Sequence, residues 1–483
     1  MTGRPNRCRR VPVRQAQVDS RRRRLASGRG IARHLVHGCA AIVIAGAGLL
    51  IGPEGAGASG SDTSAAVAGS VESNADGGLA ALPTGEPIRL GLIEGFSGPF
   101  ANAGDAVWRN ILFAVDRINA RGGVRVGGLA RPLQLERLDS KGQADEALTM
   151  LRRAADLRMP FVLQGNSSTV AGALSEAVTR HNEREPGNRI LFLNYSAVDP
   201  VLTNERCSFW HFRFDAHVGM RMNALVDALA QNRDIRRVYL LNQDYSFGRE
   251  VSKMARAAIS ARRPDIQIVG DELHPLGRIK DFVPYAAKIQ AAGADTVLTG
   301  NWGNDLTFLV RAAREVGLAA DFYTFYGNGL GAPAAIGEAG VGRVRAVAEW
   351  HPNAGVEAAE PIYDDFRDQL ADVRDDYFNM RHVVMIEMLA AAIESAGSTE
   401  AVSVARALEG RRHDGAPYEA AMRADDHQIL TPLHVSAMQK AGPAAGPGAP
   451  IHDLEGSGFG FVTERQLSLD ESALPHACSM VRP

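Results

Sequence analysis

The sequence has 483 residues, enough for two domains of ordinary size with additional segments. Hydrophobic residues make up 45% and charged residues 22%, which is normal for a soluble globular protein. The formal net charge is −2, but beyond residue 58 there are 42 basic and 53 acidic residues, and this acidic body argues against nucleic acid as a partner.

The first 58 residues predict a signal peptide. They contain eleven Arg and no Lys, and the apolar run CAAIVIAGAGLLI occupies 39–51. A membrane-spanning helix needs about 20 apolar residues, so this run is short for a span and typical of a secretory signal. Ala56-Gly57-Ala58 is an A-x-A cleavage site, which predicts a mature protein that begins at Ser59 and is located in the periplasm. The alternative is that this segment is a buried core helix with a basic extension. The sequence leaves open which start codon is used and whether export is by the Sec or the Tat route.

Cysteine usage agrees with export. Cys8 and Cys39 lie within the predicted signal peptide, which leaves Cys207 and Cys478. One remaining pair in an exported protein predicts a disulfide that ties the C-terminal tail to the middle of the chain, with two unrelated buried thiols as the alternative. No CxxC pair or H-E-x-x-H motif is present, so we expect no metal site.

Strand and helix patterns alternate through most of the chain. Residues 59–86 are rich in Gly, Ala and Ser and predict a flexible leader. A first series has expected strands at 88–93, 133–138, 161–164 and 190–193, with helices at 107–118, 144–159 and 168–184. A second series has strands at 238–241, 267–269, 296–298 and 322–325, separated by helices at 219–231, 249–260, 282–292 and 305–316. This alternation predicts an α/β protein with two doubly wound lobes of parallel sheet.

The remaining elements are too few for a third domain. A strand at 345–350 and helices at 377–396 and 398–409 must complete the earlier lobes, so the chain crosses between them more than once. We expect lobe 1 to contain 87–213 plus 349–430 and lobe 2 to contain 214–348 plus 431–483, joined by a multi-strand hinge. Ligands bind at the carboxyl ends of the strands in open α/β sheets, so such a clamshell encloses its ligand between two strand edges.

Four segments carry a family resemblance. They are the loop 95–100 (GFSGPF) with Gly104, the helix end 116–124 (DRINARGGV), the segment 194–203 (NYSAVDPVLT) and the loop 244–248 (DYSFG), which has one residue more between Tyr and Gly than the family pattern. In this order and at strand ends, they resemble the type I periplasmic binding proteins of the branched-chain amino acid (Leu/Ile/Val) ABC transporter family, and the likeness runs from 88 to 435. The resemblance implies a monomeric clamshell that captures an amino acid or similar small polar organic ligand for an ABC permease.

The resemblance also implies a set of ligand-binding residues. In the family, backbone N–H groups and hydroxyls of lobe 1 hold the ligand carboxylate, which implicates the residues that follow the third and fourth strands; free N–H groups beside short polar side chains suit an anion. Ser167 has a simple helix N-cap as its alternative role. Tyr245 stands where the family places an aromatic ring, and Trp302 between glycines suggests a stacking wall. The expected set is Ser97, Phe100, Gln164, Asn166, Ser167, Ser196, Ala197, Val198, Tyr245, Asn301, Trp302 and Asn328.

Asn328 is a departure from the family pattern. Amino acid binders of the family have a glutamate there that pairs with the ligand ammonium, and an amide cannot neutralise that charge. Either Asp305 or Asp244 supplies the missing charge, or the ligand is not an α-amino acid, and amides, ureas and carboxylates are then candidates.

Two other functions compete with transport. An enzyme is disfavoured because the chain has no G-x-S-x-G motif and its Gly327–Ala332 segment has the wrong glycine spacing for a dinucleotide loop, so we expect no catalysis and no cofactor. A periplasmic sensor that reports its ligand to a membrane receptor would capture the ligand in the same way, and the sequence leaves this alternative open.

Overall fold

A computed structural model describes residues 83–483. The predicted signal peptide and most of the predicted leader therefore lie outside the described residues. Within the described part of the chain, no helix is long and apolar enough to span a bilayer.

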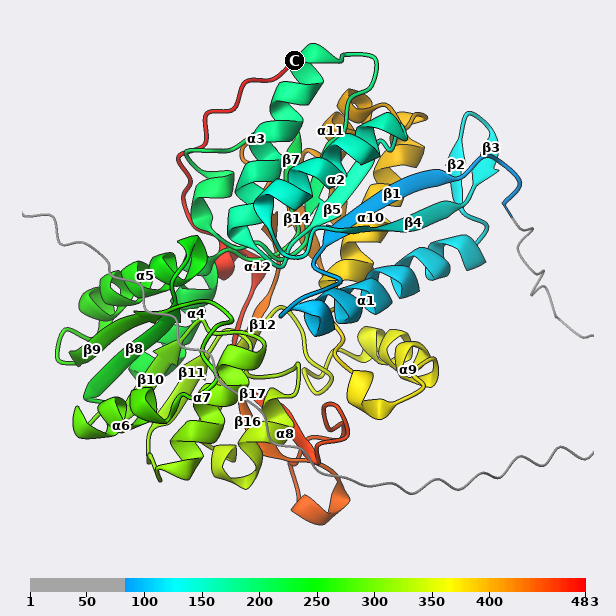
Figure 1. Ribbon diagram of the computed structural model, residues 1–483. Helices are drawn as coiled ribbons and strands as arrows, with labels where there is room; N and C mark the ends of the chain where they lie inside the picture. The colour runs from blue at the N-terminus through cyan, green and yellow to red at the C-terminus, as the bar shows by residue number, and fades with distance from the viewer. Residues whose placement is uncertain (1–82) are drawn as a thin grey trace, which may run out of the picture. The chain divides into compact units, whose positions relative to one another are not determined.

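The first sheet has five parallel strands in the order β4-β1-β5-β6-β7 (Figure 1). Helix α1 packs against α10, and α2 packs against α3. The strands are β1 Ile88–Glu94, β4 Leu133–Asp139, β5 Phe161–Gln164, β6 Leu191–Asn194 and β7 His211–Arg213; the helices are α1 Ala101–Ala120, α2 Ala144–Asp156, α3 Ser168–Arg184, α10 Arg381–Ala396 and α11 Ala401–Leu408. We name this part lobe 1.

The second sheet has seven strands in the order β17-β16-β12-β11-β10-β8-β9. Its strands are β8 Arg237–Gln243, β9 Gln267–His274, β10 Thr296–Thr299, β11 Asp321–Thr324, β12 Val344–Ala348, β16 Leu433–Lys440 and β17 Phe459–Leu467. Its helices are α4 Val218–Gln231, α5 Ser246–Arg262, α6 Val283–Ala291, α7 Asn304–Glu315, α8 Ala332–Ile336 and α12 Leu469–Ser472. We name this part lobe 2.

Short elements complete the chain. They are the hairpin β2 Val124–Val126 and β3 Leu129–Arg131, helix α9 Glu360–Asp368, the small sheet β13 Arg412–His413, β14 Ala420–Met422 and β15 Ile429–Leu430, and the 3₁₀ turns η1 Pro200–Thr203, η2 Gly337–Gly340, η3 Glu357–Ala359, η4 Val373–Asp375 and η5 Pro443–Ala445.

Alternating side chains show how the lobe 2 sheet is covered. Val238 and Leu240 of β8 pack in one buried cluster with Phe247 of α5, whereas Tyr239 and Leu241 pack in another with Leu309 of α7. Since neighbouring residues of a strand point to opposite faces, both faces of this sheet are buried under helices. The predicted α/β class with two doubly wound sheets is confirmed.

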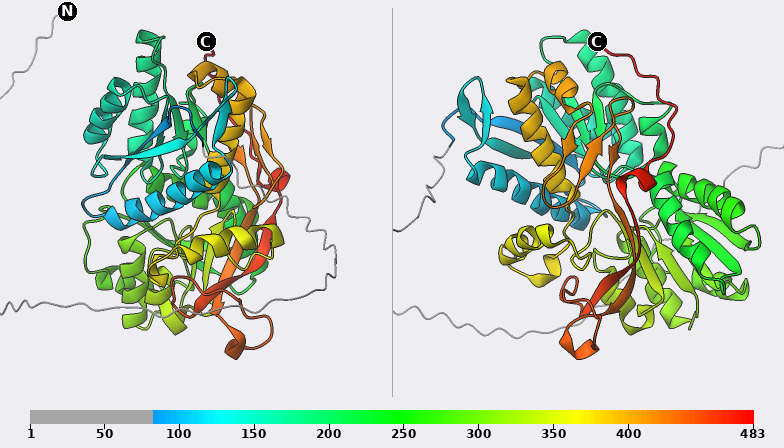
Figure 2. Two further views of the ribbon diagram at one scale, coloured as in Figure 1. Left: turned by 90° about the vertical axis from the view of Figure 1, so that its right-hand side faces the viewer. Right: turned by 180° about the vertical axis from the view of Figure 1, so that it is seen from behind.

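The edge of the second sheet differs from the prediction. The strand and helix alternation predicted parallel pairing throughout, but β16 pairs antiparallel with both β12 and β17 (Figure 2, right, orange and red). The loop between β16 and β17 contains the Gly- and Pro-rich segment 441–450, and a direct loop of this kind joins antiparallel neighbours without a crossover helix.

The chain leaves the five-stranded sheet after β7 and enters the seven-stranded sheet at β8. It leaves that sheet after β12 for α10, which packs on α1, and for the small sheet β13–β15, and it re-enters the seven-stranded sheet at β16. All strands of the five-stranded sheet fall within 87–213, and all strands of the seven-stranded sheet fall within 214–348 and 431–483. The exact residues at which the lobes divide remain a prediction.

A disulfide fastens the C-terminal tail to lobe 1. Cys207 and Cys478 are bonded with an S–S distance of 2.07 Å, so the predicted pairing is confirmed. The tail continues along lobe 1 (Figure 1, red), where the backbone N–H of Ala477 donates to Asn204 Oδ1 at 2.9 Å and Arg482 pairs with Glu409 at 3.0 Å.

Candidate ligand-binding pocket

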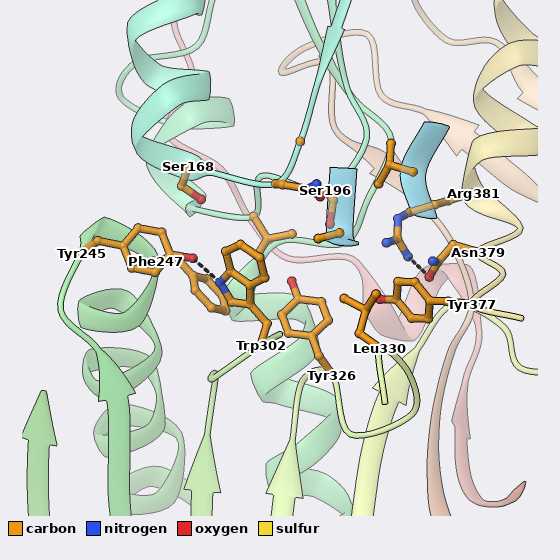
Figure 3. A pocket seen from close by; sticks show the side chains of 15 residues that line it. Ser168, Ser196, Tyr245, Phe247, Trp302, Tyr326, Leu330, Tyr377, Asn379 and Arg381 are labelled. Carbon is orange, nitrogen blue, oxygen red and sulfur yellow. Dashed lines mark hydrogen bonds between the residues drawn. The ribbon is translucent and has the colours of Figure 1, made fainter. Parts of the chain in front are cut away.

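A pocket lies at the carboxyl ends of strands from both sheets (Figure 3). The space open to the centres of water molecules is about 40 Å³, more than twice the ~10–15 Å³ that one water needs. Strand ends of lobe 1 and of lobe 2 contribute to it, together with helix α1 and the start of α10. Its lining residues are Ala103, Val107, Gly165, Asn166, Ser168, Ser196, Val198, Tyr245, Phe247, Trp302, Tyr326, Leu330, Tyr377, Asn379 and Arg381.

Lobe 2 contributes an aromatic wall. The Trp302 indole Nε1 donates to the Tyr245 hydroxyl at 2.9 Å, which fixes the two rings relative to one another (Figure 3). Phe100 is not among the residues that line the pocket, but its ring packs on Trp302 with centroids 4.7 Å apart. Burial raises the pKa of Tyr245 well above its usual value, so its hydroxyl stays protonated. Tyr245 and Trp302 thus lie where a stacking wall was predicted.

Lobe 1 contributes a loop whose amides are already occupied. The buried carboxylate of Glu94, at the end of β1, accepts hydrogen bonds from the backbone N–H groups of Gly165 and Asn166, both at 2.9 Å. Gly95 N–H at 3.1 Å, Gln164 Nε2 at 3.3 Å and the Tyr195 hydroxyl also donate to Glu94. Burial raises the pKa of Glu94, while these hydrogen bonds oppose that shift. Asn166 lines the pocket as predicted, but its N–H is not free for a ligand.

The loop after β6 has the same property. The side-chain oxygen of Asn194 accepts from the backbone N–H groups of Ser196 at 3.1 Å and Ala197 at 2.7 Å. Ser196 and Val198 nevertheless line the pocket, while Ala197 is buried beside it. The N–H groups of Ser196 and Ala197 are therefore occupied within the protein.

Several predicted ligand-binding residues lie outside the pocket. Ser167 is the N-cap of α3, where its hydroxyl accepts from Val170 N at 3.4 Å, and Ser168 lines the pocket in its place. Ser97 donates to Asp139 at 2.7 Å, and Gln164 points toward Glu94.

The remaining two are Asn301 and Asn328. The side chain of Asn301 is fully buried and meets His274 Nε2 at 3.1 Å. Asn328 lies between Tyr326 and Leu330, and those two neighbours line the pocket instead. A strand-end position thus brought each residue near the pocket without fixing the direction of its side chain.

Neither proposed counter-charge reaches the pocket. Asp244 is exposed and pairs with Arg249 at 2.8 Å. Asp305 is buried, and its Oδ2 accepts from Gln243 Nε2 at 2.9 Å and from Gly277 N at 2.8 Å. Both carboxylates lie outside the set of lining residues.

Sequence reasoning missed the segment before α10. We expected a helix from residue 377, but α10 begins at Arg381 because Asn110 of α1 holds the preceding backbone outside the helix. Its Nδ2 donates to Tyr377 O and its Oδ1 accepts from Asn379 N, both at 2.8 Å. This clamp places Tyr377, Asn379 and Arg381 on the pocket. The available signal was an Arg at the start of an otherwise apolar helix, where an unpaired charge would be costly.

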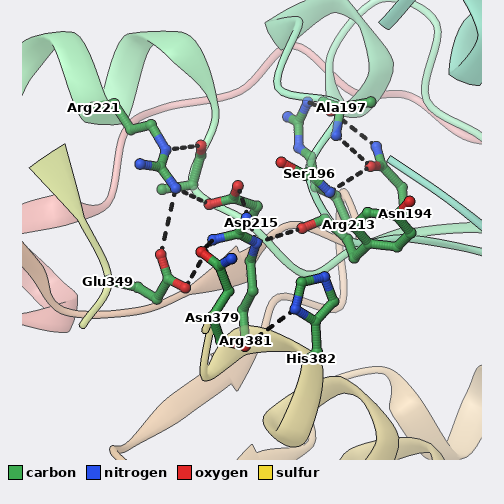
Figure 4. A network of polar contacts seen from close by, with 12 residues as sticks. Asn194, Ser196, Ala197, Arg213, Asp215, Arg221, Glu349, Asn379, Arg381 and His382 are labelled. Carbon is green, nitrogen blue, oxygen red and sulfur yellow. Dashed lines mark hydrogen bonds and ion pairs between the residues drawn. The ribbon is translucent and has the colours of Figure 1, made fainter. Parts of the chain in front are cut away.

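Arg381 belongs to a buried network of four charges (Figure 4). Its Nη1 donates to Glu349 Oε1 at 2.9 Å, and its Nε lies 3.6 Å from Asp215 Oδ2. Arg221 of α4 contacts the same two carboxylates. Burial alone would raise the pKa of Glu349, but Arg381 and Arg221 outweigh it and lower that pKa. Asp215 follows β7 and Glu349 follows β12. Through Arg381, which lines the pocket, the network therefore connects the pocket with two of the segments that link the lobes.

Among residues 83–483, no group of His, Cys, Asp and Glu side chains has the arrangement of a metal site.

Comparisons with known proteins place the chain in a family. The family described as periplasmic binding protein matches residues 87–443. The Leu/Ile/Val-binding protein homolog 4 of Brucella abortus (strain 2308) is 32% identical over 418 residues, covering 84% of this chain and 95% of that protein.

Solved structures agree with this placement. The closed leucine-, isoleucine-, valine-, threonine- and alanine-binding protein of Brucella ovis matches at TM-score 0.71 and 30% identity, covering 83% of this chain and all of that one. A solute-binding protein of R. palustris in complex with 4-hydroxybenzoate shares the fold at TM-score 0.63 and 16% identity, covering 73% of this chain and 93% of that one. The chain therefore belongs to the periplasmic binding protein family, among the type I members of the branched-chain amino acid group, and is a solute-binding protein rather than an enzyme.

Proposed function

We propose that this protein captures a small organic solute in the pocket between lobes 1 and 2 and delivers it to the permease of an ABC importer. One observation carries the proposal: strand-end residues of both sheets, including Ser196 from lobe 1 and Trp302 from lobe 2, line a single pocket. Ligands bind at such strand ends in open α/β sheets, and a pocket shared by two lobes is a general basis for ligand-linked closure.

The chemistry of closure follows from this sharing. A ligand held first by one lobe gains contacts with the other lobe only when the lobes are together, so binding shifts the equilibrium toward the closed form. The permease would then recognise the closed form by the relative placement of the outer faces of the lobes. The lobe boundaries expected from the sequence, at 213/214, 348/349 and 430/431, are the proposed hinge positions.

Family members work outside the cytoplasm, and we infer that export removes residues 1–58 and releases the mature protein into the periplasm. N-terminal sequencing of protein purified from a periplasmic extract tests this step. A mature chain that begins at Ser59 is expected, and retention of the apolar run 39–51 would contradict it.

A thermal-shift screen of residues 59–483 against amino acids, amides and organic acids tests the capture itself. A solute that binds the folded state raises the melting temperature in proportion to the logarithm of its concentration. A concentration-dependent rise with at least one solute is expected. A melting temperature unchanged by every solute class would argue against solute capture.

A further inference from the structure

The charged side chains that line the pocket are of one sign. In the described part of the chain, Arg381 is the only lining residue with a permanent charge, and no lining residue is Asp, Glu or Lys. Arg381 is only 5% exposed, so its charge acts in a site from which most water is excluded. Charge interactions in such a site are stronger than at the surface.

The donors at one end of the pocket are not all used. Arg381 Nε donates to Tyr195 O at 2.9 Å, and Nη1 donates to Glu349 and to Asn379 Oδ1. Arg381 Nη2 takes part in none of these bonds. Among the described residues that line the pocket, the Nδ2 groups of Asn379, beside Arg381, and of Asn166, after β5, are buried without acceptors. Buried donors without acceptors are costly, so a ligand that supplies acceptor atoms at this end gains binding energy.

Four backbone N–H groups in the strand-end loops of lobe 1 already have acceptors within the protein. The N–H groups of Gly165 and Asn166 donate to Glu94, and those of Ser196 and Ala197 donate to Asn194. The carboxyl group of Glu94 therefore takes the place of a ligand acceptor on the loop that follows β5. Arg381 is the one charged lining residue within 83–483 that can pair with a ligand carboxylate, and its planar guanidinium suits that group well.

Within residues 83–483, no residue that lines the pocket has a carboxylate to neutralise a ligand ammonium. Asp305 and Asp244 lie outside it with partners of their own, and the carboxylates of Asp215 and Glu349 lie outside it too, against the two arginines (Figure 4). Burying an unpaired ammonium is strongly unfavourable. The opposite end of the pocket is the wall of Tyr245 and Trp302, with Tyr326 between this wall and Leu330, and the wall suits a flat or branched apolar group (Figure 3).

We infer that the ligand is a small monocarboxylate with an apolar body and no ammonium group, its carboxylate bound by Arg381 and its body packed on the Tyr245–Trp302 wall. This inference rests on the proposed solute-binding function and narrows its ligand class.

Matched ligands test the inference by calorimetry on residues 59–483. One series is 4-methylpentanoate, L-leucine, 3-methylbutylamine and 4-methylpentanamide; the other is 3-phenylpropanoate, L-phenylalanine and 2-phenylethylamine. At least one carboxylate is expected to bind about tenfold or more tightly than its amino acid, with no binding by the amines. An amino acid or amide that binds more tightly than its carboxylate overturns the inference while solute capture stands. If none of these ligands binds and no solute of the wider thermal-shift panel binds, both the ligand class and the proposed solute capture are contradicted.

A double variant tests the role of Arg381. Arg381→Met alone leaves Glu349 buried with less charge compensation, so Arg381→Met is combined with Glu349→Gln. Carboxylate affinity is expected to fall at least about tenfold while a cooperative melt is retained. Arg345→Met with Glu464→Gln removes an ion pair of lobe 2 at 2.8 Å, outside the pocket, and is expected to leave affinity unchanged. Equal affinity of the Arg381 double variant and the wild type would overturn the assignment.

Discussion

The backbone N–H of Asn166 donates to the carboxylate of Glu94 at 2.9 Å, one strand away in the same sheet. This contact means that the lobe 1 loop, which resembles an anion site in sequence, binds an anion of the protein itself. Glu94 does not line the pocket, but it holds the backbone of Gly165 and Asn166, which do. Ligand specificity then depends on residues from other parts of the chain.

Glu94→Gln tests the structural importance of this carboxylate. Both carboxylate oxygens of Glu94 accept hydrogen bonds, Oε2 from Gly95 N at 3.1 Å and Oε1 from Gly165 N and Asn166 N. In either orientation of the Gln amide, its NH₂ group would face one of these donors, and that hydrogen bond would be lost. We expect the free energy of unfolding, measured by urea denaturation, to fall by about 3 kcal/mol. Glu136→Gln, in a partly exposed pair with Arg89, is the control and should cost about 1 kcal/mol or less. A Glu94→Gln protein as stable as the wild type would contradict this role.

Tyr245→Ala tests the aromatic wall. The substitution removes a ring that lines the pocket and the acceptor of the Trp302 indole N–H. We expect ligand affinity, measured by calorimetry, to weaken about tenfold, with little effect on folding because Tyr245 is only partly buried. Tyr285→Ala, at a half-buried position on α6 outside the pocket, serves as the matched control. Unchanged affinity for Tyr245→Ala would remove this residue from the site.

Replacement of Cys207 and Cys478 by Ser tests the tether. The disulfide closes a loop with a sequence separation of 271 residues, so its loss frees the unfolded chain. Stability should drop by about 2–5 kcal/mol, visible as a lower melting temperature. Neither cysteine lines the pocket, so ligand affinity should stay the same. A melting temperature that does not change in the double variant or in reductant would show that the tether adds no stability.

Glu455 gives a pH dependence. It is buried, and its carboxylate accepts from the backbone N–H of Gly331 at 2.8 Å, next to the pocket residue Leu330. Burial raises the pKa of Glu455 to about 7, with the Gly331 hydrogen bond opposing. A raised pKa favours the folded state at low pH, so this contribution is full below the unfolded pKa of 4.5 and is lost as the pH rises through about 7.

Comparing Glu455→Gln with the wild type isolates this effect. Between pH 4.5 and pH 8, the wild type should lose about 3 kcal/mol of unfolding free energy that the variant keeps. Urea denaturation at several pH values measures the difference. Parallel curves for wild type and Glu455→Gln would contradict the assigned pKa.

The alternation of strands and helices was sufficient to predict the fold. Buried runs such as that of β5 and amphipathic helices such as α3 have clear periods, and strand-end reasoning placed Asn166, Ser196, Val198, Tyr245 and Trp302 at the pocket. The antiparallel strands β16 and β17 were missed, because we expected no strand after 345–350.

The polar end of the pocket could not be predicted in the same way. Arg381 and Asn379 lie at the start of α10, more than 180 residues after Ser196 in the sequence. They line the pocket because Asn110 holds the backbone that precedes α10. That clamp is a tertiary contact without a local sequence signal. Likewise, only the folded structure shows that Glu94 uses the amides of the β5 loop.

A crystal structure of residues 59–483 with the best-binding carboxylate from the matched series tests the central claim most directly. The account predicts ligand density between Trp302 and Arg381, with the carboxylate on the guanidinium. The account would be contradicted by ligand density elsewhere, for example in the groove between α2 and α3 that Arg152 and Arg180 line. A crystal in which the pocket contains no ligand would also contradict it.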